Sequence, residues 1–260
     1  KVPYPNGGTN FPSDFSDHRD VSFVGRPFPL AEADEHFARL KSWGMNCVRL
    51  LTTWEAVEHK GPGQYDTAYL DYFAEITGQA GAYGLYVFID FHQDVWSRMS
   101  GGDGAPGWTF EAVGLDFTKF HASGAAHVMQ HKYDYARGGA QEDRYPMMTW
   151  ANNYRMPANA IMWTLFFAGD LFVPEFKIEG RSAQDYLQGH YLGAMREIAK
   201  RVKGMSHVLG FDTLNEPGTG WIGRALSYRH VERSAEHPDP VRPGPAWSVL
   251  DGLLVAQGLP

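Results

Sequence analysis

The chain has 260 residues, is 43% hydrophobic and 14% aromatic, and carries a formal net charge of −7 at pH 7. This composition is ample for a globular core, and the acidic balance argues against a nucleic-acid partner. The single cysteine, Cys47, falls in an apolar run that we expect to be a buried strand. An internal disulfide is therefore excluded, and an intracellular location, in cytoplasm or vacuole, is expected.

The first predicted unit is a helix followed by a strand. Phe37, Leu40 and Trp43 form an apolar stripe that Gly44 ends, and residues 45–51 then read as an apolar strand. Arg49 interrupts this strand, where a guanidinium is costly unless a carboxylate pairs with it. A structural ion pair and a functional role are both open for Arg49.

The second unit repeats this order between residues 66 and 91. Asp66 is placed to cap a helix, Gly84 to end it, and residues 85–91 read as a strand that runs into His92-Gln93-Asp94. Residues 45–91 are therefore predicted to form a βαβ unit. A lone histidine after a strand is more often structural than catalytic, so the position of His92 is informative only together with other strand ends.

Residues 96–181 read as a long insertion. Its run 160–168 is strongly apolar but far shorter than the ~20 residues that span a bilayer. We expect a buried helix that starts at Asn159, with a lipid-binding role as the alternative. The insertion also carries large or flexible apolar side chains that would suit a ring-fused or long-chain group: Trp108, Met147, Met148, Trp150 and Met162.

The last predicted unit leads into the most informative motif. Ser182 opens a helix, Gly204 ends it, and the run from 208 reads as a strand buried on both faces and followed by Asn215-Glu216-Pro217. Pro217 disfavours helical geometry at Glu216 and predicts that it is extended. The alternation of helices and strands indicates an α/β fold with a parallel sheet, whose polar strand ends would converge on one edge. A solvated turn is the alternative for the tripeptide alone.

Arg49, His92 and Asn215-Glu216-Pro217, each at a predicted strand, together resemble glycoside hydrolase family five, a retaining group with an eight-stranded β/α (TIM) barrel. The string 90–98, followed by Gly-Gly-Asp-Gly-Ala-Pro at 101–106, resembles its endoglycoceramidase-related branch and is similar to fungal glucosylceramidases and steryl-β-glucosidases. The resemblance implies a β-glucosidase of lipid glucosides, either steryl glucoside or glucosylceramide. It further implies a glycolipid partner, no cofactor or metal, and peripheral contact with a membrane.

The resemblance also implies roles for single residues. Glu216 corresponds to the general acid/base, and Asn215 to the residue that binds the sugar 2-hydroxyl. Arg49 corresponds to the residue that orients the nucleophilic carboxylate, and His92 to a residue that binds the glucose ring. Further contacts with the sugar are expected from Asp94, Lys1 and Trp150.

Part of the family's eight-stranded barrel is not recognised in this sequence. Only strands two to four are recognised, and the nucleophile of the family, a glutamate on strand seven, has no counterpart here. We therefore expect residues 1–260 to form a partial catalytic barrel domain, with the insertion at about 96–181 and the nucleophile in a C-terminal portion of the same enzyme. The alternative is a non-catalytic glycolipid-binding or scaffolding fragment.

Overall fold

The structure is a computed structural model and describes residues 15–128 and 150–225, together with 4–5, 133–134, 140–141 and the positions 227, 250 and 254. Its strands are β1 (Tyr4–Pro5), β2 (Val21–Ser22), β3 (Cys47–Thr52), β4 (Tyr86–Phe91), β5 (Tyr133–Asp134), β6 (Ala140–Gln141), β7 (Lys177–Ile178), β8 (Arg181–Ser182) and β9 (Val208–Asp212). Its α-helices are α1 (Ala33–Ser42), α2 (Trp54–Glu58), α3 (Thr67–Ala82), α4 (Trp108–Ala112), α5 (Phe120–Ser123), α6 (Pro157–Phe172) and α7 (Ala183–Val202). Short 3-10 helices are η1 (Leu30–Glu32), η2 (Arg98–Ser100), η3 (Phe117–Lys119) and η6 (Trp150–Arg155).

A parallel sheet in the order β3-β4-β9 lies at the centre of the described fold and confirms the predicted parallel arrangement. Its register pairs Leu51 with Asp90 and Asp90 with Asp212. Because paired residues of neighbouring strands project to the same side of a sheet, these three side chains share one face. The carboxyl ends of all three strands meet at one edge.

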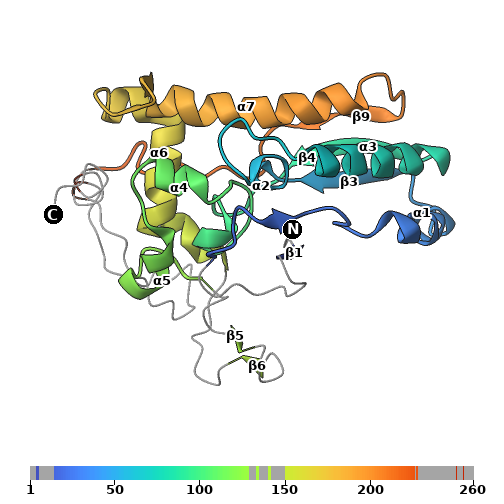
Figure 1. The fold of residues 1–260 in the computed structure, drawn as a ribbon, viewed down its shortest axis with the longest axis horizontal. Helices are drawn as coiled ribbons and strands as arrows, with labels where there is room; N and C mark the ends of the chain where they lie inside the picture. The colour runs from blue at the N-terminus through green and yellow to red at the C-terminus, as the bar shows by residue number, and fades with distance from the viewer. Residues whose placement is uncertain are drawn as a thin grey trace.

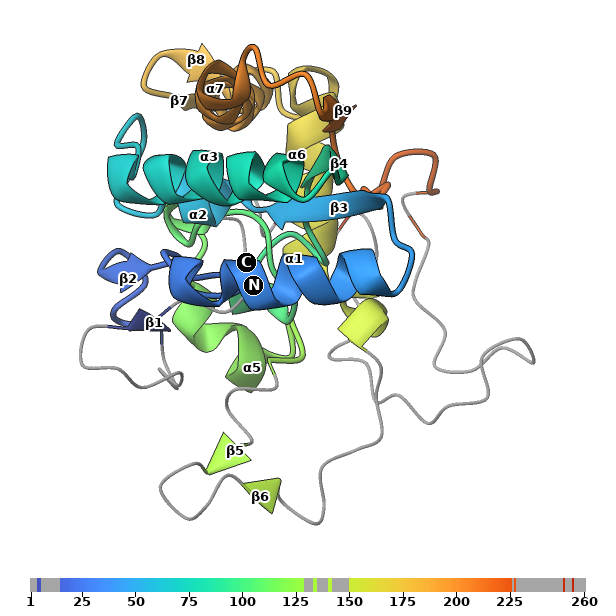
Figure 2. The same ribbon diagram turned by 90° about the vertical axis from the view of Figure 1, so that its right-hand side faces the viewer.

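Helices α3 and α7 pack against each other, and α6 lies crosswise at one end of α7 (Figure 1). Figure 2 shows α1 and α3 on either side of β3. The predicted caps of the two long helices are confirmed: Asp66 Oδ1 accepts from the Tyr69 amide at 3.0 Å, and Ser182 Oγ accepts from the Asp185 amide at 3.1 Å. Gly84, between the end of α3 and the start of β4, has φ +68°, a left-handed conformation that favours glycine.

The apolar run of the insertion is the buried helix that its composition predicts. Helix α6 begins at Pro157 rather than at Asn159, because proline fits the first turn, where its missing amide hydrogen costs nothing. Asn159 is instead fully buried inside the helix. Among the described residues, no helix combines the length and the hydrophobicity that crossing a bilayer requires.

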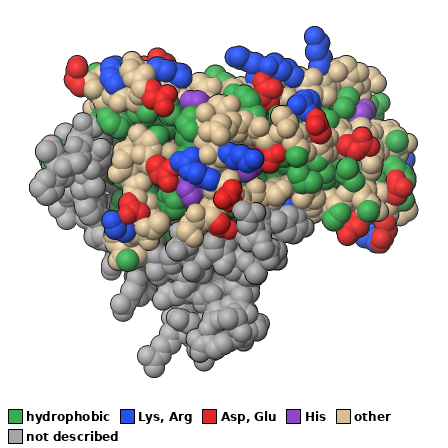
Figure 3. Space-filling view, viewed as in Figure 1, with side chains coloured by type: hydrophobic (Ala, Val, Ile, Leu, Met, Phe, Trp, Pro, Cys, Tyr) green, Lys and Arg blue, Asp and Glu red, His purple; other side chains and the backbone are tan. Residues whose placement is uncertain are grey.

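The two outer strands of the sheet are less buried than predicted. Leu209 and Phe211 of β9 are 61% and 41% exposed, and Cys47 at the start of β3 is exposed. Two expectations are therefore wrong for the described chain: that the strand from 208 is buried on both faces, and that Cys47 lies in a buried strand. Both β3 and β9 are outer strands of the described sheet, with a neighbour on one side only. Elsewhere the visible surface intersperses charges of both signs with apolar side chains (Figure 3).

Candidate active site

Side chains from β4 and from the end of β9 surround the guanidinium of Arg49. Its Nη2 lies 2.8 Å from Asp212 Oδ2 and 3.1 Å from Asp90 Oδ2, and it donates to Asn215 Oδ1 at 2.9 Å. The carboxylate pairing that the sequence requires of Arg49 is therefore present. Because 38% of the Arg49 side chain remains exposed, a further anionic group can still approach it.

Asp90 joins Arg49 to His92. It is fully buried, and its Oδ2 also lies 2.6 Å from His92 Nδ1. Residues two apart on a strand project to the same side, so Asp90 and His92 share a face where β4 ends. This contact holds the imidazole ring of His92 against the Asp90 carboxyl group. We refer to Arg49, Asp90, His92 and Asp212 as the strand-end cluster.

The chain that follows β9 brings Asn215 to this cluster. Its backbone amide donates to Phe91 O at 3.4 Å and so extends the pairing of β4 with β9 by backbone contact. Its side-chain Nδ2 donates to Gln93 O at 3.0 Å. With the amide nitrogen engaged by the loop after β4, the amide oxygen of Asn215 is turned toward Arg49.

Glu216 has φ +37° and an exposed side chain. The expectation that Pro217 holds it extended is wrong, since this φ lies in the left-handed region, which costs a non-glycine residue about 1–3 kcal/mol. Two donors select the conformation: the carbonyl oxygen of Glu216 accepts from Gln93 Nε2 at 2.8 Å and from Tyr154 Oη at 2.7 Å. A tyrosine hydroxyl is protonated at neutral pH and can donate, and burial raises the pKa of the Tyr154 hydroxyl further.

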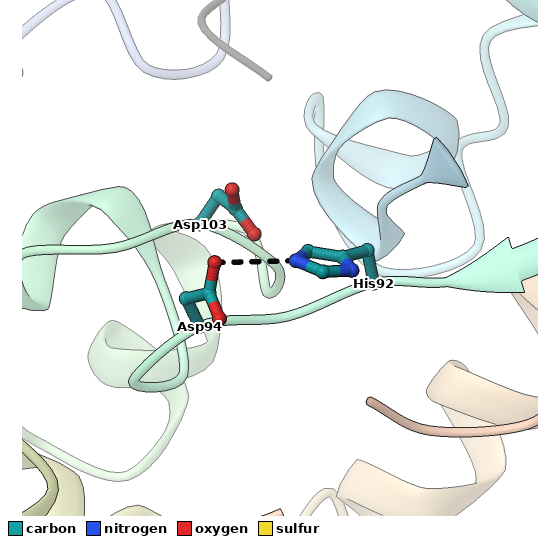
Figure 4. Close-up of side chains that lie close together, drawn as sticks. All are labelled: His92, Asp94 and Asp103. Carbon is teal, nitrogen blue, oxygen red and sulfur yellow. Dashed lines mark hydrogen bonds and ion pairs between the residues drawn. The ribbon is translucent and has the colours of Figure 1, made fainter. Parts of the chain in front are cut away.

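The loop after β4 returns on itself and brings Asp94 beside Asp103 (Figure 4). The two residues exchange backbone hydrogen bonds of 2.9 and 3.0 Å, and His92 Nε2 lies 3.2 Å from Asp94 Oδ2. A Cβ at Gly102 would meet the Asp94 carbonyl oxygen at 1.9 Å, so only glycine permits this approach. The loop therefore presents carboxylates at the same edge as the strand-end cluster.

In the described part of the chain, His92, Asp94 and Asp103 are the group whose spacing would suit a metal ion, with donor atoms within 4.8 Å of one another. Both ring nitrogens of His92 already face carboxylates, those of Asp90 and Asp94. A metal at His92 would have to displace one of these contacts. Hydrogen bonds to a polyhydroxylated ligand need not displace a contact, because a carboxylate oxygen can accept more than one hydrogen bond.

The structure gathers most of the predicted site residues at this edge and adds others. Brought together are Arg49, His92, Asp94, Asn215 and Glu216. Lys1 lies outside the described residues, and Trp150 opens η6 but its side chain is not described. Sequence reasoning missed Asp90 and Asp212, although each is a charge in an otherwise apolar strand and was open to the argument applied to Arg49. It also missed Gln93 and Tyr154.

Of the five residues predicted to form an apolar surface of the insertion, two have described side chains, and both are internal. Trp108 and Met162 are buried, and Trp108 Nε1 donates to Glu58 O at 2.7 Å, so neither offers a surface to a ligand. Met147 and Met148 lie outside the described residues. A small pocket does adjoin the site, with mostly aromatic walls: Trp54, His92, Gln93, Trp96, Trp163, Phe166 and Tyr191.

Known proteins are similar to this chain in sequence, and a solved structure is similar to it in fold. A glucosylceramidase of Rhizopus delemar is 48% identical over 223 residues, which cover 85% of this chain and 32% of that protein. An ergosteryl-β-glucosidase of Saccharomyces cerevisiae is 41% identical over 221 residues, covering 80% and 29%. The crystal structure of sterylglucosidase 1 of Cryptococcus neoformans matches with a TM-score of 0.81 at 36% identity, over 98% of this chain and 36% of that chain.

This chain spans about a third of the length of these relatives. The profile of the cellulase family matches residues 8–236, a range that contains the strand-end cluster, Asn215 and Glu216. The likeness to solved structures extends over nearly the whole chain. The chain therefore belongs to the cellulase family, glycosyl hydrolase family 5.

Proposed function

We propose that the protein is a retaining β-glucosidase of lipid β-glucosides and that Glu216 is its general acid/base. The observation that carries this proposal is the position of Asn215-Glu216 after β9, next to a cluster in which Arg49 is paired but still accessible. Carboxyl ends of parallel strands are where β/α-barrel enzymes carry their catalytic groups. The exposed carboxylate of Glu216 is available to a substrate at this edge.

In this mechanism Glu216 protonates the glycosidic oxygen while a second carboxylate attacks the anomeric carbon, and the aglycone leaves as an alcohol. Glu216 then takes a proton from the water that displaces the enzyme carboxylate. The amide of Asn215 is placed to bind the sugar 2-hydroxyl, and His92 with Asp94 to bind other hydroxyls. Arg49 would orient the attacking carboxylate through a charge-assisted hydrogen bond.

We infer that β3, β4 and β9 are strands two to four of an eight-stranded barrel. The parallel order, the intervening helices and the exposed apolar residues of β9, Leu209 and Phe211, support this inference. A retaining pair of carboxylates is ~5–5.5 Å apart. The attacking carboxylate should therefore lie at that distance from Glu216 and within reach of Arg49, and we expect it from polypeptide beyond residues 1–260.

The substrate class rests on the relatives, which are named for glucosylceramide and for ergosteryl glucoside. We propose that β-glucosides of membrane lipids are preferred over cellobiose. Comparing steryl glucoside, glucosylceramide and cellobiose at equal concentration tests this choice, and a clear preference for cellobiose would refute it. Intracellular location and peripheral membrane contact remain predictions.

The acid/base assignment is tested by Glu216→Gln in the full-length protein. Turnover of natural glucosides should fall ~10²–10⁴-fold, because the amide cannot donate or take up the proton. Substrates with activated leaving groups should lose less in their first step. Glu35→Gln, an exposed position on α1, is the matched control and should keep wild-type rates. Near-wild-type hydrolysis of a natural glucoside by the Glu216 variant would overturn the assignment.

A further inference from the structure

We propose that Gln93 and Tyr154 are positioning residues that clamp the backbone at Glu216 and so fix the direction of its carboxylate. This inference rests on the proposed acid/base role of Glu216. It assigns a task to the glutamine between His92 and Asp94 and to a tyrosine of the insertion, neither of which takes part in the mechanism above.

Gln93 links the loop after β4 to the segment after β9. Its side chain is buried, and its Nε2 donates to the carbonyl oxygens of Asn215 at 2.6 Å and of Glu216 at 2.8 Å. Its Oε1 accepts from the Trp96 amide at 2.9 Å. The backbone carbonyl of Gln93 in turn accepts from Asn215 Nδ2. One residue therefore holds both members of the Asn215-Glu216 pair from the neighbouring strand end.

Tyr154 supplies a second donor from a distant part of the chain. Its hydroxyl donates to Glu216 O at 2.7 Å and accepts from Gln93 Nε2 at 3.1 Å. The Glu216 carbonyl thus receives two hydrogen bonds from partners that also contact each other. Gln93 Nε2 has two hydrogens for three acceptors, so one hydrogen is shared between two oxygens. Such a triangle fixes the orientation of the peptide plane as well as its position.

The clamp acts where the backbone is least able to hold its own conformation. Glu216 adopts φ +37° without a glycine's freedom, and strained positions of this kind persist only when the surroundings hold them. The next residues are confined as well, since a Cβ at Gly218 would meet Trp163 Cδ1 at 2.4 Å. Because the Glu216 side chain is exposed, its direction depends on the backbone and not on packing around the carboxylate.

The test is Tyr154→Phe in the full-length protein, assayed with two β-glucosides that differ only in leaving group. On an alkyl glucoside, which needs protonation to leave, kcat should fall roughly tenfold, equivalent to about 1.4 kcal/mol. On a dinitrophenyl glucoside, which leaves without protonation, the first step should change by less than about threefold. KM should stay within about twofold on both, because the clamp makes no contact with the sugar.

A second variant probes the other donor. Gln93→Glu keeps an acceptor for the Trp96 amide but replaces the Nε2 donor by an oxygen that faces two carbonyl oxygens. We expect a larger loss on the alkyl glucoside than in the tyrosine variant. A smaller loss should also occur on the dinitrophenyl glucoside, because Gln93 holds Asn215 as well. Tyr72→Phe is the matched control: it also removes a hydroxyl that donates to a carbonyl, that of Phe28 at 2.6 Å, and should leave both substrates unaffected.

Glu216→Gln separates failure of this inference from failure of the proposed function. Selective loss on the alkyl glucoside in Glu216→Gln, with none in Tyr154→Phe and Gln93→Glu, overturns the clamp alone. Equal loss on both substrates in the first step, the formation of the glycosyl-enzyme, in Glu216→Gln overturns the acid/base role and the clamp with it. Adding Tyr154→Phe to Glu216→Gln should cost little more on the alkyl glucoside, and a full further tenfold loss would contradict positioning through Glu216.

Discussion

The strand-end cluster and a second group of charged side chains around α2 use the same residue types in opposite surroundings. The second group, the α2 cluster, consists of Glu55, Glu58 and His59 with their partners Arg98, His190 and Asp66. The side chains of Glu55 and Arg98 are 1% and 4% exposed, whereas those of Arg49 and Asp212 are 38% and 36% exposed. The α2 cluster is closed to water at its Glu55–Arg98 pair, and the strand-end cluster is open at Arg49 and Asp212.

The difference in exposure separates charges that stabilise the fold from charges that can bind a ligand. In the α2 cluster, Glu55 accepts from Arg98 Nε at 2.8 and 3.0 Å. Burial raises the pKa of the Glu55 carboxyl against the opposing effect of Arg98. Such a pair keeps its neighbours in place only while it is complete. The open cluster can instead exchange part of its hydration for a ligand, and it is the open cluster that adjoins Glu216.

The largest effect is expected for Arg98→Met, which leaves Glu55 buried without its partner and tests whether the α2 cluster needs a complete ion pair. The free energy of unfolding should fall by about 3–5 kcal/mol, measured by urea unfolding of the full-length protein with tryptophan fluorescence. The double variant Glu55→Leu with Arg98→Met should recover most of this loss, because it removes both charges at similar volume. A loss below about 1 kcal/mol in the single variant would show that the α2 cluster tolerates an incomplete pair.

The same variant has a predictable pH dependence. Without Arg98, the folded-state pKa of Glu55 should rise further above its ordinary value of 4.5. A carboxyl with a raised folded-state pKa stabilises the fold below its unfolded pKa, and this contribution is lost as pH rises through the folded pKa. The stability difference between wild type and Arg98→Met should therefore be smaller at pH 5 than at pH 8. Unfolding curves at both values test the sign.

Arg49→Lys tests whether the strand-end cluster contributes to activity and not to stability. We expect kcat/KM on a natural glucoside to fall ~10- to 100-fold, because an ammonium cannot reproduce the directed contacts of a guanidinium with several oxygens. The unfolding midpoint should change little, since the charge is kept and the site is open to water. Arg201→Lys, in the surface pair with Asp71, is the matched control. Unchanged kinetics at position 49 would make Arg49 purely structural.

The central elements were predictable because their signals are local. Helix α3 follows from Asp66 and Gly84, helix α7 from Ser182 and Gly204, and each strand from an apolar run between them. Arg49 was correctly expected to pair with carboxylates, because a guanidinium within an apolar strand is costly without an anionic partner. The same argument reaches Asp90 and Asp212.

What could not be predicted depends on contacts between distant segments. The left-handed conformation of Glu216 is selected in part by Tyr154, 62 residues earlier in the chain. A tryptophan in the sequence can equally belong to the core or to a ligand-binding surface. Trp108 is in the core because it packs against Trp54 and Tyr186. The exposure of Phe211 depends on which elements lie next to β9, and this cannot be predicted from the residue type.

The smallest effect concerns Asp66, the partly exposed member of the α2 cluster. It caps α3 through the Tyr69 amide and lies 3.0 Å from His59 Nε2. Burial alone would raise its pKa, but the hydrogen bonds from His59 and Tyr69 outweigh burial and hold the pKa below its usual 3.8. A depressed carboxyl pKa stabilises the fold above the unfolded value, and the contribution is lost as pH falls through the folded value.

Asp66→Ala should therefore cost about 1–2 kcal/mol at pH 7, where cap and charge are both lost. Asp66→Asn, which keeps an acceptor for the cap, should cost less, and its deficit should be smaller at pH 3 than at pH 7. Asp71→Asn on the exposed side of the same helix is the control. A deficit of Asp66→Asn that persists unchanged at pH 3 would mean that the charge of Asp66 contributes nothing to stability.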